Sequence, residues 1–97
     1  MFFWLRKVEL AKERVKIRVG EGGHNIDEDI IVRRYWRGIL NLFDLFLPLV
    51  DEAMIFDNSE GLPVLIAEKA LNESLSIINE PLFCQLNDQY EAGKQNR

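Results

Sequence analysis

The stretch Arg14–Ile39, RVKIRVGEGGHNIDEDIIVRRYWRGI, decides the fold of this chain. A glycine-rich turn at residues 20–23 separates two segments whose apolar residues recur at helical spacing. The first segment predicts a helix over residues 7–19, which the glycines end because they readily adopt left-handed backbone angles. The second predicts a helix over residues 28–46, with acidic residues in the first turn, where the helix dipole favours them.

Short apolar runs on both sides of the two helices predict strands. One run, at residues 2–5, precedes the first helix. Two more, at residues 54–57 and 63–67, follow the second helix and are expected to form a hairpin, because the residues between them are typical of turns. Helices that alternate with strands predict an α/β chain.

The last third of the chain is less clearly patterned. Residues 67–78 fit either a helical stripe or a strand at 75–78 that follows a turn. Pro81 suits the start of a short final helix that reaches about Tyr90. Residues 92–97 are expected to form a frayed polar tail.

Composition bounds the classes of function. The chain has 97 residues, of which 47% are hydrophobic and 29% charged, so we expect a single folded domain rather than a disordered chain. Its pI of about 5.0 disfavours general binding to nucleic acid. A single cysteine, Cys84, excludes an intramolecular disulfide and favours a cytoplasmic location. The longest apolar run is interrupted by polar residues and proline, so no membrane span is expected.

Basic residues gather in the first half of the chain. Residues 1–50 hold nine Lys or Arg and seven Asp or Glu, whereas residues 51–97 hold three and nine. Helical spacing places Arg14 and Arg18 on one face of the first helix, and Arg33 and Arg37 one turn apart on the second, beside Arg34. Guanidinium groups suit phosphate because each can donate two parallel hydrogen bonds. Two helices that meet at the glycine turn would bring these groups towards one anion.

Plainer interpretations of the polar residues stay open. The arginines could form a solvated surface on which Asp29 pairs with Arg33. His24, after the glycines, fits a surface or capping role better than phosphate contact or acid–base work. The carboxylates of Asp51, Glu52 and Asp57 fit a solvated loop better than paired acid–base groups. The sequence predicts no metal site, since its only histidine and only cysteine stand sixty residues apart.

The order of these residues resembles the lid segment and following strands of the zeta-toxin-like P-loop kinases. The likeness is carried by Arg14–Ile26, Ile30–Ile39, Asn41–Phe43, Leu47–Asp51 and Ile55–Ser59, and it covers about residues 2–67. It implies that residues 1–97 are a partial P-loop kinase fold, the C-terminal part of such a domain. The family has proline where Asp27 stands, and its phosphate loop and acidic base are missing from these residues.

The resemblance also implies roles for individual residues. Lid arginines of the family bind the transferring phosphate of ATP, which the complete domain uses with Mg²⁺. That phosphate-binding role falls on Arg18, Arg34 and Arg37. Arg14, Arg33 and Asn58 are further nucleotide-binding candidates. The implied function is the lid and distal-sheet portion of an ATP-dependent small-molecule kinase, inactive without the phosphate loop.

Two other functions remain as alternatives. Apolar strand edges around residues 2–5 and 54–56 predict an assembly module that forms a homo-oligomer. Two helices followed by a hairpin at 54–67 would also fit a winged-helix nucleic-acid binder. The acidic pI and a connection of about eight residues between the helices argue against that binder, because helix-turn-helix motifs use shorter connections.

Overall fold

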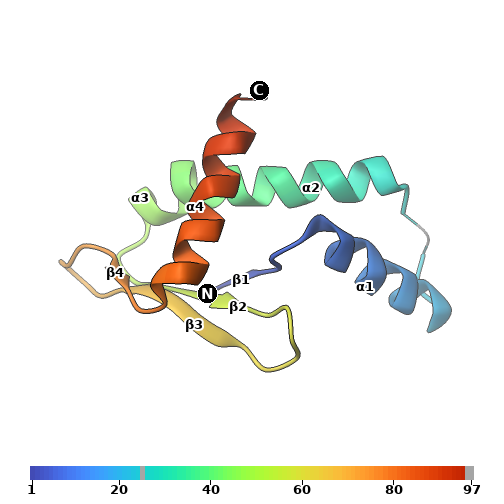
Figure 1. Ribbon diagram of the computed structural model, residues 1–97, viewed down its shortest axis with the longest axis horizontal. Coiled ribbons are helices and arrows are strands. Elements are labelled where there is room, and N and C mark those ends of the chain that lie inside the picture. Colours follow the sequence, from blue (N-terminus) through green and yellow to red (C-terminus); the bar gives the residue numbers. More distant parts are fainter. Residues whose placement is uncertain (25, 96–97) are drawn as a thin grey trace.

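The computed structural model describes residues 1–24 and 26–95 (Figure 1). Two long helices, α1 and α2, follow the first strand, and another long helix, α4, follows the last strand. The elements are β1 (Phe2–Trp4), α1 (Val8–Gly20), α2 (Glu28–Asn41), η1 (Leu42–Phe46), α3 (Leu47–Leu49), β2 (Ala53–Asp57), β3 (Val64–Lys69), β4 (Ser76–Ile77) and α4 (Glu80–Gln95). The chain is therefore α/β, as its pattern predicts.

The strands form one mixed sheet in the order β1-β2-β3-β4. β1 runs parallel to β2, with Phe3 opposite Phe56, whereas β2, β3 and β4 pair antiparallel. Parallel neighbours need a long connection. The α1–α2 segment is that connection, so the glycine turn lies at the far end of the crossover from the sheet (Figure 1).

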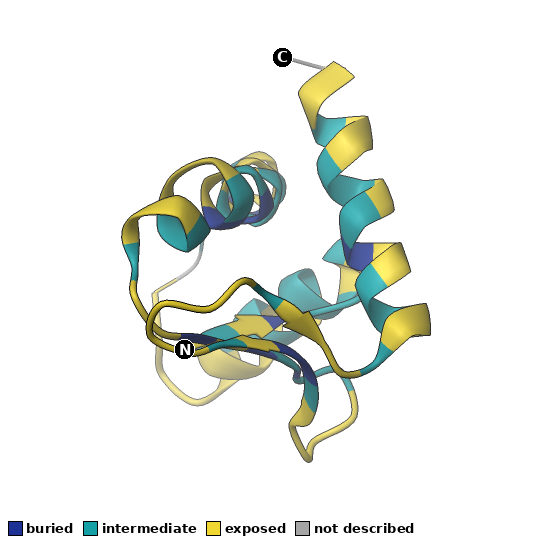
Figure 2. Cartoon of the chain, turned by 90° about the vertical axis from the view of Figure 1, so that its left-hand side faces the viewer, coloured by how far each residue is buried: buried dark blue, intermediate teal, exposed yellow. Residues whose placement is uncertain are grey.

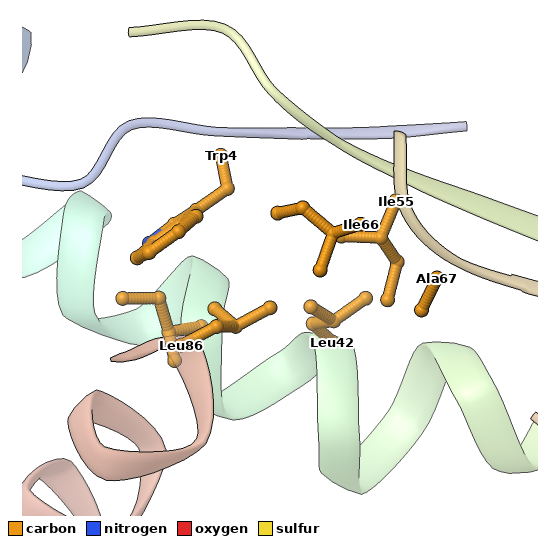
Figure 3. Close-up of a cluster of buried hydrophobic side chains, with 7 residues drawn as sticks. Trp4, Leu42, Ile55, Ile66, Ala67 and Leu86 are labelled. Carbon is orange, nitrogen blue, oxygen red and sulfur yellow. The ribbon is translucent and has the colours of Figure 1, made fainter. Parts of the chain in front are cut away.

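The core lies between one face of the sheet and the helices α2 and α4 (Figure 2). Figure 3 shows the buried side chains that meet there from the sheet, from α2 with η1, and from α4. They are Trp4, Ile39, Leu42, Ile55, Ile66, Ala67 and Leu86. Removing this apolar surface from water is the main force that holds the helices on the sheet.

The predicted helix at 7–19 and the predicted strands at 2–5, 54–57 and 63–67 are confirmed, with end residues that shift by one or two, and the predicted helix at 28–46 is confirmed with an end three residues later. The second helix continues without a break through the π-helical turn η1 and the single turn α3 to Leu49. Pro48 therefore lies inside this last helical turn.

Of the two structures predicted for residues 67–78, the strand is confirmed. β4 pairs with β3, and Asn72 in the preceding turn has a φ of 62°, in the left-handed region. The helical alternative over 67–78 is wrong, because its apolar residues serve the sheet edge and the turn instead.

The predicted frayed tail at 92–97 is wrong as far as Gln95, because α4 extends to that residue. Gly93 lies close to α2: a Cβ at this position would be 3.4 Å from Leu40 Cδ2 and 3.7 Å from Trp36 Cε3. Packing against α2 thus stabilises helical turns that the local sequence does not. The end of the predicted tail, residues 96–97, lies outside the described residues, as does Asn25, a candidate cap of α2.

Candidate functional site

The glycine turn closes back onto the end of α1. The Gly23 N–H donates a hydrogen bond of 2.8 Å to the Arg18 carbonyl oxygen, and Gly22 has a φ of +100°. A Cβ at Gly23 would lie 2.8 Å from the same oxygen, closer than real Cβ contacts. Glycine is therefore needed at both positions, by conformation at one and by close approach at the other. The turn fixes the backbone from which the Arg18 side chain projects.

A cavity of about 290 Å³ lies between α1 and α2 beside this turn. Arg18 lines it from α1 and Arg34 from α2, and both residues are exposed, so the two helices bring two arginines to the margin of one cavity. The remaining wall is largely apolar. The lining residues are Ala11, Val15, Arg18, Ile26, Ile31, Arg34 and Tyr35.

The two arginines of this cavity carry uncompensated charge. In the described part of the chain, neither Arg18 nor Arg34 forms an ion pair with an acidic side chain. One ion pair does join the two helices nearby, between Lys12 Nζ and Glu28 Oε2 at 3.8 Å. Two exposed cations at one cavity attract an anion, and salt in the surrounding water screens this attraction.

The other predicted arginines lie elsewhere. Arg33 and Arg37 are exposed on α2 and do not line the cavity. Among the described residues, Asp29 and Arg33 form no ion pair, so the pairing expected for a neutralised surface is absent there. Arg34 alone of the three α2 arginines thus lines the same cavity as Arg18.

Arg14 and Asn58 are hydrogen-bonded, although no local sequence pattern connects them. Arg14 Nη2 donates a hydrogen bond to the Asn58 carbonyl oxygen, and the Asn58 N–H donates one of 2.8 Å to the Trp4 carbonyl oxygen. These bonds tether α1 to the loop that follows β2. Both residues therefore hold the crossover helix against the end of the sheet.

Asp57 is buried, with 4% of its surface exposed, so the solvated-loop interpretation is wrong for this residue. Its carboxylate accepts hydrogen bonds from the Ser59 N–H at 3.1 Å and the Ser59 hydroxyl at 2.5 Å, and it pairs with Arg6 Nε at 3.2 Å. Asp51 by contrast is exposed, as expected. The signal in the sequence was the alternation Ala53, Ile55, Asp57, which points Asp57 to the core side of the strand.

Arg6 joins the carboxyl ends of β1 and β2. Besides Asp57, it pairs with Glu60 through Nη2 and Oε1 at 2.6 Å. The hydrogen bond to Glu60, with added attraction from the Asp57 and Glu60 charges, raises the pKa of Arg6 above its ordinary value. A second cavity, of about 490 Å³, opens beside this network and is lined by Arg6, Lys7, Leu10, Ser59, Glu60 and Gln85. Ligands of α/β sheets commonly bind beyond the carboxyl ends of the strands.

A hydrogen-bond network around Gln89 connects both large helices to the end of β1. Gln89 Oε1 accepts from Trp4 Nε1 at 3.0 Å, and Gln89 Nε2 donates to the Arg6 carbonyl oxygen at 2.7 Å. The Tyr35 hydroxyl lies 2.6 Å from the Leu5 carbonyl oxygen and 3.0 Å from Gln89 Oε1. Burial raises the pKa of Tyr35 above its ordinary value. Since Tyr35 also lines the α1–α2 cavity, this network positions one wall of the candidate site.

Other classes of site find little support in the described residues. His24 is exposed in the turn. Across residues 1–24 and 26–95, no group of three or more His, Cys, Asp or Glu side chains is arranged to hold a metal ion. No helix in the same residues combines the length and apolar character that crossing a bilayer requires.

Comparison with known proteins identifies no relative of this chain. No protein-family model, no curated protein and no solved structure matches the chain. The resemblance to the zeta-toxin-like kinases therefore stays a prediction from the residues quoted above.

Proposed function

We propose that this chain is the lid and distal-sheet portion of an ATP-dependent small-molecule kinase of the zeta-toxin-like type. In this proposal Arg18 and Arg34 bind phosphate groups of the nucleotide. The observation that carries it is the cavity between α1 and α2, where two arginines without an acidic partner among the described residues face one volume.

The connection of the elements supports a partial P-loop kinase fold. β1 and β2 are parallel neighbours, and a helical crossover that carries the arginines joins them. Within the described residues, β1 pairs with β2 alone. A further parallel strand with a phosphate loop after it would therefore find an open position beside β1.

The chemistry of the cavity fits phosphate. Positioned cations stabilise the negative charge that spreads over a migrating phosphoryl group, and bound ATP with Mg²⁺ would supply that group in a complete domain. Arg18 and Arg34 would neutralise its oxygens from two sides. The cavity beyond the carboxyl ends of β1 and β2 is adjacent to Asn58 and is large enough for the rest of the nucleotide. We assign no metal ligand to the described residues.

Arg37 and Arg33 are left out of the proposed binding pair because they do not line the cavity. They provide a matched control for it. The double variant Arg33→Gln/Arg37→Gln removes the same charge from α2 as Arg18→Gln/Arg34→Gln removes from the cavity, without touching its wall.

Isothermal titration of the 97-residue chain with ATP and with tripolyphosphate tests this function. Each charged hydrogen bond contributes about 1.5–3 kcal/mol, so we expect Arg18→Gln/Arg34→Gln to weaken binding at least about tenfold. The control double variant should change it about twofold, through long-range attraction alone. Equal losses in both variants, or no binding by the unaltered chain, would overturn the proposal.

A further inference from the structure

One face of the sheet carries exposed apolar side chains. Trp4 and Ile55 point to the helices, so the alternation of the strands sends Phe3, Met54 and Phe56 to the other face. Phe3 is 51% exposed and Met54 37%. The Phe3 and Phe56 rings stack on one another, with centroids 5.4 Å apart. Figure 2 shows α2 and α4 on the opposite side of the sheet.

The chain also exposes more surface than a compact monomer of its mass. Its accessible surface is 6698 Å², against about 5,700 Å² for a typical monomer of 11.3 kDa. Its radius of gyration is 14.3 Å, against about 12.5 Å for a compact domain of this length. The surplus, about 1,000 Å² of surface, is close to the roughly 800 Å² that each partner buries in a standard interface.

The edge of β1 offers a place for this burial. In the described part of the chain β1 is hydrogen-bonded on one side only, to β2. Its three residues, Phe2–Trp4, include no proline or lysine of the kind that protects natural edge strands. The outer side of this short strand presents free N–H and C=O groups to another strand.

Charge favours a second copy in antiparallel orientation. Lys7 follows the carboxyl end of β1, is exposed, and forms no ion pair within the described residues. At the opposite end, the exposed Asp51 and Glu52 precede β2, which runs parallel to β1. Antiparallel pairing brings each Lys7 towards the Glu52 of the partner, whereas parallel pairing would place lysine beside lysine.

From these observations we propose that this chain forms a two-fold symmetric dimer by antiparallel pairing of β1 with β1 of a second copy. A two-fold axis makes the contact self-complementary and closed. Phe3 of each copy lies at its centre, so that the stacked Phe3–Phe56 pairs of both copies form one aromatic stripe across a continuous sheet. Lys7 and Glu52 flank the stripe at both ends.

The dimer goes beyond the proposed kinase function, and separate residues test the two proposals. Arg18 and Arg34 lie between α1 and α2, away from the β1 edge. The variant Arg18→Gln/Arg34→Gln should therefore leave dimerisation unchanged while it weakens ATP binding. A strand from a completing kinase segment would compete with the second copy for the same edge.

Sedimentation equilibrium over a range of protein concentrations tests the dimer. We expect the unaltered chain to be a dimer at high micromolar concentration and Phe3→Glu to weaken dimerisation by at least about tenfold, since it places two carboxylates at the centre of the contact. Leu62→Glu is the matched control, because Leu62 is 82% exposed in the turn between β2 and β3 and lies outside the β1 edge. The Leu62→Glu variant should leave the dissociation constant of the dimer unchanged. Circular dichroism verifies that both variants fold.

Exchange of charge tests the orientation. An exposed ion pair contributes at most about 1 kcal/mol, so Lys7→Glu should weaken the dimer by about threefold to tenfold over its two pairs. The double variant Lys7→Glu/Glu52→Lys should restore it. A monomer at every concentration, or equal losses in Phe3→Glu and Leu62→Glu, would overturn the proposal. Failure of the double variant to restore the dimer would overturn the antiparallel orientation.

Discussion

Gln89 is the residue whose replacement most sharply tests how the helices are held on the sheet. Its amide accepts a hydrogen bond from Trp4 and donates one to the Arg6 carbonyl oxygen, at 3.0 Å and 2.7 Å. Leucine at this position has a similar volume but can make neither bond. The change Gln89→Leu therefore removes the polar link between α4 and the end of β1 while keeping the apolar contacts of the helix.

The size of the loss follows from the groups that the change leaves behind. Trp4 is 2% exposed, so its indole N–H cannot turn to water. A buried donor or acceptor without a partner costs about 1–3 kcal/mol, and two groups are affected, so we expect Gln89→Leu to lower the free energy of unfolding by about 2–4 kcal/mol. In a chain of this size that is a large share of the total stability.

The control is Gln85→Leu, one turn earlier on α4. Gln85 is exposed, and its side chain forms no hydrogen bond with another side chain or the backbone among the described residues. A surface change of this kind stays within about 0.5 kcal/mol. Urea unfolding of both variants, followed by tryptophan fluorescence and by circular dichroism at one protein concentration, gives the two free energies. Equal losses in the two variants would refute the role of the Gln89 network.

Three further outcomes are expected. Burial raises the pKa of Tyr35, so at alkaline pH the unfolded chain loses the hydroxyl proton before the folded chain does. The contribution of Tyr35 to the free energy of unfolding is therefore fully present below about pH 10 and falls as the pH rises above that value. Tyr35→Phe should remove that part of the fall in urea titrations at alkaline pH. Gly23→Ala should cost about 1–3 kcal/mol through its 2.8 Å approach to the Arg18 carbonyl, whereas Gly20→Ala, with nothing within 4 Å, should cost nothing; thermal unfolding compares them. Leu86→Ala should lower the urea midpoint by the equivalent of about 2–5 kcal/mol, because Leu86 is fully buried in the core.

The main elements could be predicted from the sequence because their signals are local. The glycine turn and the apolar spacing on both sides of it place α1 and α2 within a residue or two. Helical spacing also indicated that Arg18 would approach an arginine of the second helix. Which arginine it meets depends on the crossing of the two helices, and the structure selects Arg34.

The parts that sequence reasoning missed depend on contacts between distant residues. Asp57 is buried because the β1–β2 pairing brings Arg6 beside it, fifty-one positions away in the chain. Gln89 acts on residues more than eighty positions away. Neither pairing leaves a local pattern that composition or periodicity can detect.

The length of α4 was missed for the same reason. Gly93 interrupts a run of otherwise good helix formers, and the helix continues to Gln95 where this glycine packs against Trp36 and Leu40. Propensity is a weak guide where tertiary contacts decide.

The arginine pair between α1 and α2 is the central feature of the proposed phosphate site. Nuclear magnetic resonance of the ¹⁵N-labelled chain during titration with ATP observes the guanidinium Nε–H groups one by one. We predict that the signals of Arg18 and Arg34 shift together, with the amides of Gly22 and Gly23, along one saturating curve. Shifts confined to Arg33 and Arg37, or no saturable shift at any arginine, would contradict the proposed site.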